Sequence, residues 1–289
     1  MRNWLEYIPF IIVASLVRAL PRRTALALGR RLGTLGRWLQ PGRVKIARDN
    51  LQHAFPESTV AEREAIIRQM FTHLGAGFTE MLRLDLAKEA TAIERDFVVD
   101  GEEHLRNALA EGRGCIVLTG HIGFWEAGNF IFSKLGYPIG VVAKPMRNPL
   151  IDRYFLRMRE MAGGYIINSR KGARRILKAL QQNHLVGILM DQHAGRRNGI
   201  QVPFFGRAAW TTPIIAELAM KYHVPIVPTY CWWLPNDCYH LDISAPILLE
   251  GELTPEKVLE NTALLTKIIE DAVRRDPAQW FWVHRRWRD

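Results

Sequence analysis

Residues 115–126 read Cys-Ile-Val-Leu-Thr-Gly-His-Ile-Gly-Phe-Trp-Glu, and this stretch decides the predicted fold. A short apolar run rich in β-branched residues stops at Gly120, and His121 follows at once. Glu126 comes five residues later, where a helical pattern begins. A buried strand that ends in a polar loop before a helix is how α/β proteins present functional side chains at one edge of a sheet. We therefore expect His121 at such an edge.

The same alternation of strands and helices continues to the C-terminus. The predicted strands are 97–100, 115–119, 139–143, 165–167, 185–190, 225–233 and 239–244, and the predicted helices are 102–111, 124–135, 149–162, 171–183, 212–222 and 255–275. Strands separated by helices predict an α/β fold with a central mixed, largely parallel sheet flanked by helices.

The front third of the chain is predicted to be helical. Residues 24–39 contain three glycines suited to close packing, and a further helix follows a cap at Ser58 or Thr59. We divide the chain into an N-terminal membrane anchor (1–22), a helical region (23–95) and an α/β core (96–289) that forms one continuous domain with the helical region.

Residues 4–20 are the most lipid-like segment. Their uninterrupted apolar part is shorter than the ~20 residues that a spanning helix needs, and Glu6, Pro9 and Arg18 interrupt the pattern. A cleaved signal peptide fits poorly, because little positive charge precedes the apolar run. We interpret the segment as an uncleaved anchor that either spans the bilayer or lies in its interface. The alternative is a buried N-terminal core helix.

The net charge of +10 is concentrated in two patches. Residues 1–50 carry ten Lys/Arg against two acids, and residues 144–178 carry ten against two, whereas residues 51–143 carry eight against thirteen. Such patches suit anionic lipid, an acidic partner protein or nucleic acid. Within the second patch, Lys171, Arg174, Arg175 and Lys178 are interpreted as ordinary helix surface.

His121 and Glu126 are the first candidates for catalysis. On one continuous helix, an i,i+5 pair would point about 140° apart, so we place His121 in the loop and Glu126 in the first helical turn, from which it reaches back to the imidazole. A carboxylate on one ring nitrogen leaves the other free to take a proton. No Gly-x-Ser-x-Gly elbow supplies a nucleophile. Direct transfer to a substrate hydroxyl is therefore favoured, and a structural histidine is the alternative.

Other polar residues follow predicted strands at the same edge. We predict that Lys144, Arg147 and Asn148, together with Asp191 and Gln192, bind substrate; a plain solvated face is the alternative for the basic strip. A metal site formed by His121, Asp191 and His193 is conceivable, but the chain has no His-Glu-x-x-His pair and no Cys/His cluster, so we predict no metal.

Two aromatic segments complete the list of candidates. Residues 202–212 are predicted to form an apolar loop, which could line a pocket for an acyl chain or belong to the core. Residues 280–288 mix tryptophan with arginine, which suits a membrane interface. Base stacking on single-stranded nucleic acid and a last strand with a basic edge are the alternatives.

Taken together and in order, these motifs resemble the late acyltransferases of lipid A biosynthesis, from about residue 5 to the C-terminus. The motifs are Asn50-Leu51 with Phe55-Pro56-Glu57, Gly120-His121-Ile122-Gly123-Phe124-Trp125-Glu126, Lys144-Pro145-x-x-Asn148-Pro149, Arg159, Asp191-Gln192, Val202-Pro203-Phe204-Phe205-Gly206 and Gln279-Trp280-Phe281-Trp282-x-His284-Arg285-Arg286. Lys144 departs from the pattern, because arginine is common there and lysine lacks its bidentate fork.

The resemblance implies an enzyme on the cytoplasmic face of the bacterial inner membrane. It would move an acyl chain from an acyl-carrier-protein thioester to a hydroxyl of a lipid A precursor or related glycolipid, with no cofactor and no nucleic acid. His121 would be the general base, Glu126 its partner, Arg159 a substrate or transition-state contact and Asp191 a supporting group. Three alternatives stay open: a family member that acylates another glycolipid or phospholipid from acyl-CoA, a hydrolase, and a basic membrane- or nucleic-acid-binding protein without catalysis.

Overall fold

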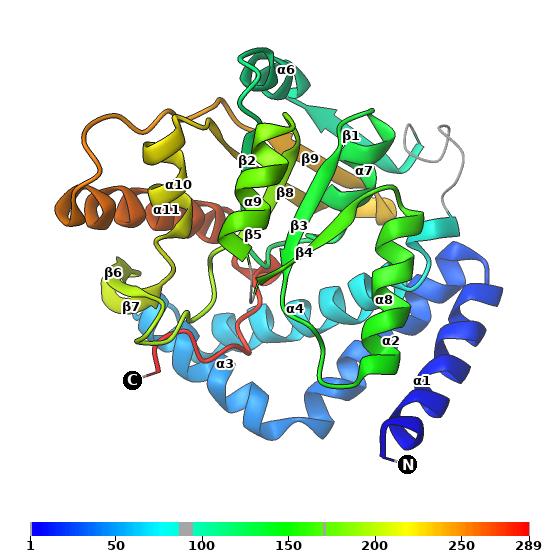
Figure 1. Cartoon of the computed structure of the whole chain (residues 1–289). Helices are drawn as coiled ribbons and strands as arrows, with labels where there is room; N and C mark the ends of the chain where they lie inside the picture. Colours follow the sequence, from blue (N-terminus) through cyan, green and yellow to red (C-terminus); the bar gives the residue numbers. More distant parts are fainter. Residues whose placement is uncertain (1, 87–94, 170–171, 289) are drawn as a thin grey trace.

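The computed structural model describes residues 2–86, 95–169 and 172–288. Its centre is a seven-stranded sheet in the order β1-β9-β8-β2-β5-β3-β4 (Figure 1). Neighbouring strands are parallel except for the β8–β9 pair, which confirms the predicted mixed, largely parallel sheet. The strands are β1 (Phe97–Asp100), β2 (Cys115–Thr119), β3 (Ile139–Ala143), β4 (Tyr165–Asn168), β5 (Leu185–Leu189), β8 (Ile226–Trp233) and β9 (Tyr239–Ile243).

Helices cover both faces of the sheet, and the side chains of β2 show how. Ile116 and Leu118 belong to one buried cluster, which includes residues of α9, α10 and α11. Cys115 and Val117 belong to another, with residues of α6 and α7. Burial on both faces explains why the strand is apolar without alternation. These helices are α6 (Glu102–Ala110), α7 (Ala127–Lys134), α9 (Gly172–Gln181), α10 (Ile214–Tyr222) and α11 (Pro255–Arg275).

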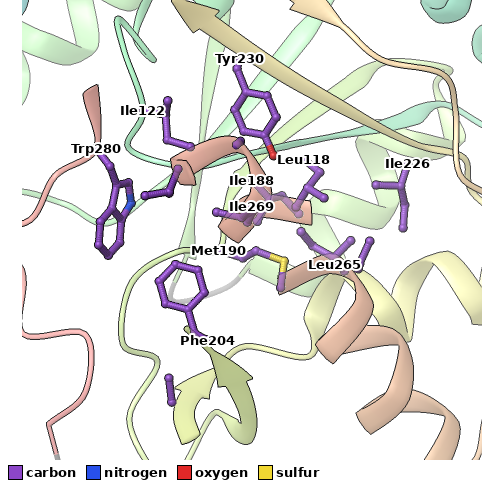
Figure 2. Close-up of a cluster of buried hydrophobic side chains, with 14 of the residues drawn as sticks. Leu118, Ile122, Ile188, Met190, Phe204, Ile226, Tyr230, Leu265, Ile269 and Trp280 are labelled. Atoms are coloured by element: carbon purple, nitrogen blue, oxygen red, sulfur yellow. The ribbon is translucent and has the colours of Figure 1, made fainter. Parts of the chain in front are cut away.

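The larger cluster joins the sheet to the C-terminal helix. In Figure 2, Leu118 of β2 and Ile188 of β5 lie close to Leu265 and Ile269 of α11. Met190, directly after β5, belongs to the same buried cluster. The end of β5 is therefore held in a packed core immediately before the polar residues Asp191 and Gln192.

A small hairpin replaces one predicted loop. β6 (Ile200–Phe204) and β7 (Arg207–Thr211) pair as a separate antiparallel sheet, whereas the sequence predicted an apolar loop there. Pro203 lowers the strand signal, but a proline is tolerated in a two-stranded hairpin because both strands are edges. Two residues with positive φ, Phe205 and Gly206, form the turn.

The front of the chain is helical, as predicted: α1 (Arg2–Ala19), α2 (Arg22–Leu39), α3 (Pro41–Ala54) and α4 (Val60–Met81), which Thr59 caps. Gly33 lets α2 pack closely on α4, since a Cβ there would lie 2.0 Å from the Phe71 carbonyl oxygen. A Cβ at Gly29 would lie 2.6 Å from the Gly75 carbonyl oxygen of α4, but a Cβ at Gly36 would meet nothing nearer than 3.7 Å. The close packing is thus confirmed for Gly29 and Gly33 only. Further elements are α8 (Pro149–Met161) and the short 3₁₀ helices η1 (Leu84–Leu86), η3 (Pro235–Asp237) and η4 (Pro277–Gln279).

Helix α1 has one packed side and one exposed side. Ala14 and Val17 are buried, and Phe10 contacts Tyr154 and Phe155 of α8. The opposite side exposes large apolar residues, namely Trp4, Leu5, Ile8, Ile12 and Leu16. In the described part of the chain, no helix has the length and apolar character needed to cross a bilayer.

Candidate active site

His121 and Asp191 face each other across two neighbouring strands. β2 and β5 are parallel, and their register pairs Thr119 with Leu189, so the chain positions two residues further on are also opposite. The His121 Nδ1 atom lies 2.8 Å from Asp191 Oδ1, and the His121 peptide N–H donates to Asp191 Oδ2 at 2.9 Å. The sheet edge therefore builds a histidine–carboxylate pair, as expected, but with a carboxylate from the adjacent strand.

Glu126 is not the partner of His121, and this prediction is wrong. Its carboxylate accepts two hydrogen bonds from Arg159 on α8, from Nε at 3.0 Å and from a terminal nitrogen at 2.7 Å. The cause is local: Gly123 adopts a positive φ and α7 begins only at Ala127. This turn directs Glu126 toward α8. Arg159 and Glu126 form a pair whose side chains are only 12% and 15% exposed.

The charge state of Asp191 fixes the role of each imidazole nitrogen. Burial opposes ionisation, but the charge of His121 and the hydrogen bonds from His121 and Trp280 lower the pKa of Asp191 to about 2. An ionised carboxylate only accepts hydrogen bonds, so Nδ1 of His121 carries a proton. Nε2 is then the basic nitrogen, and the Gln192 side-chain amide donates to it at 3.2 Å.

Hydrogen bonds from backbone N–H groups hold the loop that carries His121 in place. The peptide N–H groups of residues 121–124 donate to Asp191, Gly120, Gln279 and Cys231 respectively. A Cβ at Gly123 would lie 2.0 Å from the Cys231 carbonyl oxygen, so glycine is required there. All four donors therefore have acceptors within the protein.

The aromatic C-terminal segment lies inside the protein, not at a membrane interface as the sequence suggested. Trp280 and Trp282 are buried, and the indole N–H of Trp280 donates to Asp191 Oδ2 at 2.8 Å. The Phe281 peptide N–H donates to the His121 carbonyl oxygen. Arg286 is fully buried and donates to the Trp210 carbonyl oxygen at 2.7 Å. The segment therefore contacts both Asp191 and the loop of His121, and Arg286 links it to the β6–β7 hairpin.

A cavity of about 1720 Å³ opens beside His121. Glu126, Arg159, Lys144 and Gln192 line it, and so do apolar side chains of β3, β5, α9 and α10. The larger aliphatic lining residues and one methionine are Val141, Val142, Ile176, Ile188, Leu189, Met190, Ile214 and, on β6, Ile200. One cavity thus combines a base, a buried ion pair and an apolar wall.

Not every predicted substrate-binding residue belongs to this cavity. Asn148 is buried, caps α8 by accepting from the Leu150 N–H, and donates to Asn3 and Glu6 of α1. Its amide holds two helices together, so its predicted role is corrected to a structural one. Arg147 is exposed and is not among the described residues that line the cavity.

His193 and His284 have a structural contact that the sequence did not reveal. The His193 peptide N–H donates to the His284 imidazole, which holds the loop after β5 against the C-terminal segment. Within residues 2–86, 95–169 and 172–288, no group of three or more His, Cys, Asp or Glu side chains is placed to hold a metal ion.

A histidine paired with a buried carboxylate thus lies beside a large cavity with an apolar wall, on a largely parallel α/β sheet. The sequence identifies the class of protein: the chain belongs to the bacterial lipid A biosynthesis acyltransferase family, whose profile matches residues 1–289. It is an acyltransferase.

Named relatives cover nearly the whole chain. The lipid A biosynthesis lauroyltransferase of Escherichia coli is 29% identical over 99% of this chain and 92% of its own length. The palmitoleoyltransferase of the same organism is 28% identical with the same coverage. A phosphatidylinositol mannoside acyltransferase of Mycobacterium tuberculosis is 27% identical over 75% of this chain and 69% of its own.

Among solved structures, the 1-acyl-sn-glycerophosphate acyltransferase of Thermotoga maritima aligns with 86% of this chain and 97% of its own, at 15% identity and a TM-score of 0.39. A likeness of that size supports no functional conclusion.

Removing Arg159 should destabilise the fold. Arg159→Ala leaves the buried Glu126 carboxylate without its partner, so we expect the free energy of unfolding to fall by roughly 3 kcal/mol. Adding Glu126→Gln should recover part of this loss, because the orphaned charge is gone. Arg157→Ala, an exposed position on the same helix, is the control and should change stability by less than about 0.5 kcal/mol. Denaturant titration measures all four proteins; equal losses at positions 159 and 157 would contradict the buried pair.

Proposed function

We propose that the protein transfers a fatty acyl chain from an acyl-carrier-protein thioester to a hydroxyl of a lipid A precursor, with His121 as general base. The observation that carries the proposal is the His121–Asp191 pair, which turns its basic nitrogen toward a large cavity with an apolar wall. The names of the two Escherichia coli relatives support lipid A as the acceptor class.

The proposed reaction is a direct transfer between the two substrates. The acceptor hydroxyl replaces the Gln192 amide at His121 Nε2 and gives up its proton to that nitrogen. Its oxygen attacks the thioester carbonyl, and a tetrahedral intermediate forms. This intermediate collapses to the ester as the carbon–sulfur bond breaks, and the proton held by His121 passes to the departing thiolate. Asp191 keeps Nδ1–H in place and stabilises the imidazolium that forms between the two steps.

The other cavity residues would serve binding and charge stabilisation. Arg159 lines the cavity while Glu126 fixes its guanidinium, so it can face developing negative charge without moving. Lys144 and Gln192 line the same space and would contact substrate. Nothing in this scheme requires a cofactor beyond the thioester.

An acidic donor protein would have a basic surface on which to dock. Lys144, Arg147, Arg153 and Arg157 are all exposed near the end of β3 and along α8. Acyl carrier protein is acidic, so complementary charge would steer its approach. The surface also lies close to the cavity, because Lys144 lines the cavity and Arg159 lies on the same helix as Arg153 and Arg157.

Helices α1 and α2 would hold the enzyme on the inner face of the bacterial inner membrane. On α2, Leu28, Leu32, Leu35 and Leu39 recur at helical spacing and are all exposed. Helix α2 directly follows α1 in the chain, and one side of α1 also exposes apolar residues. Apolar residues beside many arginines are typical of a helix that lies in the interface of an anionic membrane.

One other acceptor class has a specific observation in its favour. The Mycobacterium tuberculosis relative is named for phosphatidylinositol mannoside, and its identity of 27% is close to that of the two lipid A enzymes, although over 75% of this chain rather than 99%. The second candidate function is therefore acylation of a mannosylated phosphoinositide by the same chemistry.

Loss of the base should abolish transfer. His121→Ala should lower the rate of acyl transfer by about 10²- to 10⁴-fold, because no other group takes the hydroxyl proton. The assay is mass spectrometry of lipid A precursors and phosphoinositide mannosides after incubation with acyl carrier protein thioester. His240→Ala is the control, since His240 pairs with Asp100 outside the cavity lining. Transfer by His121→Ala at the wild-type rate would refute the assignment of the base.

The exposed leucines of α2 should be required for binding to membranes. Leu32→Glu with Leu35→Glu places two charges on the proposed lipid-facing side, so flotation with anionic phospholipid vesicles should fall at least about tenfold. Leu259→Glu with Leu264→Glu on α11 is the matched control, because these leucines are 45% and 47% exposed against 45% and 50% on α2. The same loss in both double variants would contradict a role specific to α2.

A further inference from the structure

We propose that a rim of four cations at the cavity mouth, Lys144, Arg174, Arg175 and Arg197, binds a phosphate group of one substrate. The proposal rests on the acyl-transfer function proposed above and specifies the chemistry of a ligand that enters this cavity. All four side chains belong to exposed residues that line the cavity. They come from three places in the chain: the end of β3, the first turn of α9 and the loop between β5 and β6.

None of the four is neutralised by the described part of the protein. The side chains of Lys144, Arg174, Arg175 and Arg197 have no hydrogen bond or ion pair with any described residue. Arg159 in the same cavity is instead paired with Glu126. Glu217 is the one remaining carboxylate among the described lining residues. Four like charges around one opening repel one another, and an anionic ligand would relieve that repulsion.

Helix α9 carries cations that line the cavity and one that does not. The sequence suggested that Arg174, Arg175 and Lys178 were equivalent surface residues. The structure separates them, because Arg174 and Arg175 line the cavity while Lys178, one turn further along, is exposed and does not. Ile176, between the two groups, is buried against the sheet. Lys178 is therefore a cation of the same helix outside the proposed site.

An anionic phosphate fits this rim better than a neutral sugar. Three arginines offer planar pairs of N–H donors, which match phosphate oxygens in a bidentate manner. The same cavity has an apolar wall on β3 and β5, so it can take an acyl chain inside while a phosphate stays at the mouth. Two sources supply such a group: the headgroup of the acceptor lipid and the phosphopantetheine arm of the donor.

Equilibrium binding to two matched pairs of probes separates these sources. The acceptor pair is a phosphorylated glycolipid and its phosphatase-treated product, and the donor pair is S-lauroyl 4′-phosphopantetheine and S-lauroyl pantetheine, which differ by one phosphate. Isothermal titration in detergent measures each probe with the wild type, with Arg174→Gln/Arg175→Gln/Arg197→Gln, and with Lys178→Gln. Binding is read directly, so the result does not depend on turnover.

For one pair, the phosphorylated probe should bind the wild type at least about tenfold more tightly, as charge-assisted hydrogen bonds of ordinary strength imply. The triple variant should lose that advantage and Lys178→Gln should keep it. The pair that responds identifies the source. If both members of each pair bind equally, or the advantage survives in the triple variant, the phosphate site is refuted and the acyl-transfer proposal stands. If the wild type binds no probe at all, both proposals fail.

Discussion

Asp191 accepts hydrogen bonds from the peptide N–H of His121, the imidazole of His121 and the indole of Trp280. The carboxylate is fully buried, and an ionised carboxylate in that position would cost several kcal/mol without such partners. Its partners come from the loop after β2 and from the C-terminal segment. One buried charge therefore organises two parts of the chain that are far apart in sequence, and the candidate active site forms where they meet.

The rest of the fold holds the Asp191 carboxylate and its hydrogen-bond donors in place. Parallel pairing of β2 with β5 places His121 opposite Asp191, and packing of Met190 and Ile188 against α11 holds the end of β5. The tail from Gln279 to Trp282 bonds to the loop of His121 and Gly123. Arg159 and Glu126 form an ion pair that also lines the cavity. His121 and Asp191 are thus held both by strand pairing and by the C-terminal segment.

The sequence predicted the sheet, its helices and His121, because apolar runs and glycine stops are local signals. It did not predict which carboxylate reaches the imidazole: Glu126 is close in sequence, but strand pairing brings Asp191 closer in space. The signal was present, since Asp191 follows an apolar strand whose carboxyl end meets that of β2. Trp280 was misassigned for a related reason. Indole and guanidinium groups suit both a membrane interface and a buried hydrogen-bonded core, and composition alone cannot separate these.

The most direct test of the central claim is the tautomer of His121, read from the ¹⁵N NMR signals of its imidazole ring. The Asp191 carboxylate should hold the proton on Nδ1 in the wild type. That signature should weaken in Asp191→Asn, which offers a single acceptor oxygen to three donors, and should persist in Glu126→Gln, whose side chain bonds Arg159 instead. A signature that survives Asp191→Asn but is lost in Glu126→Gln would contradict the account.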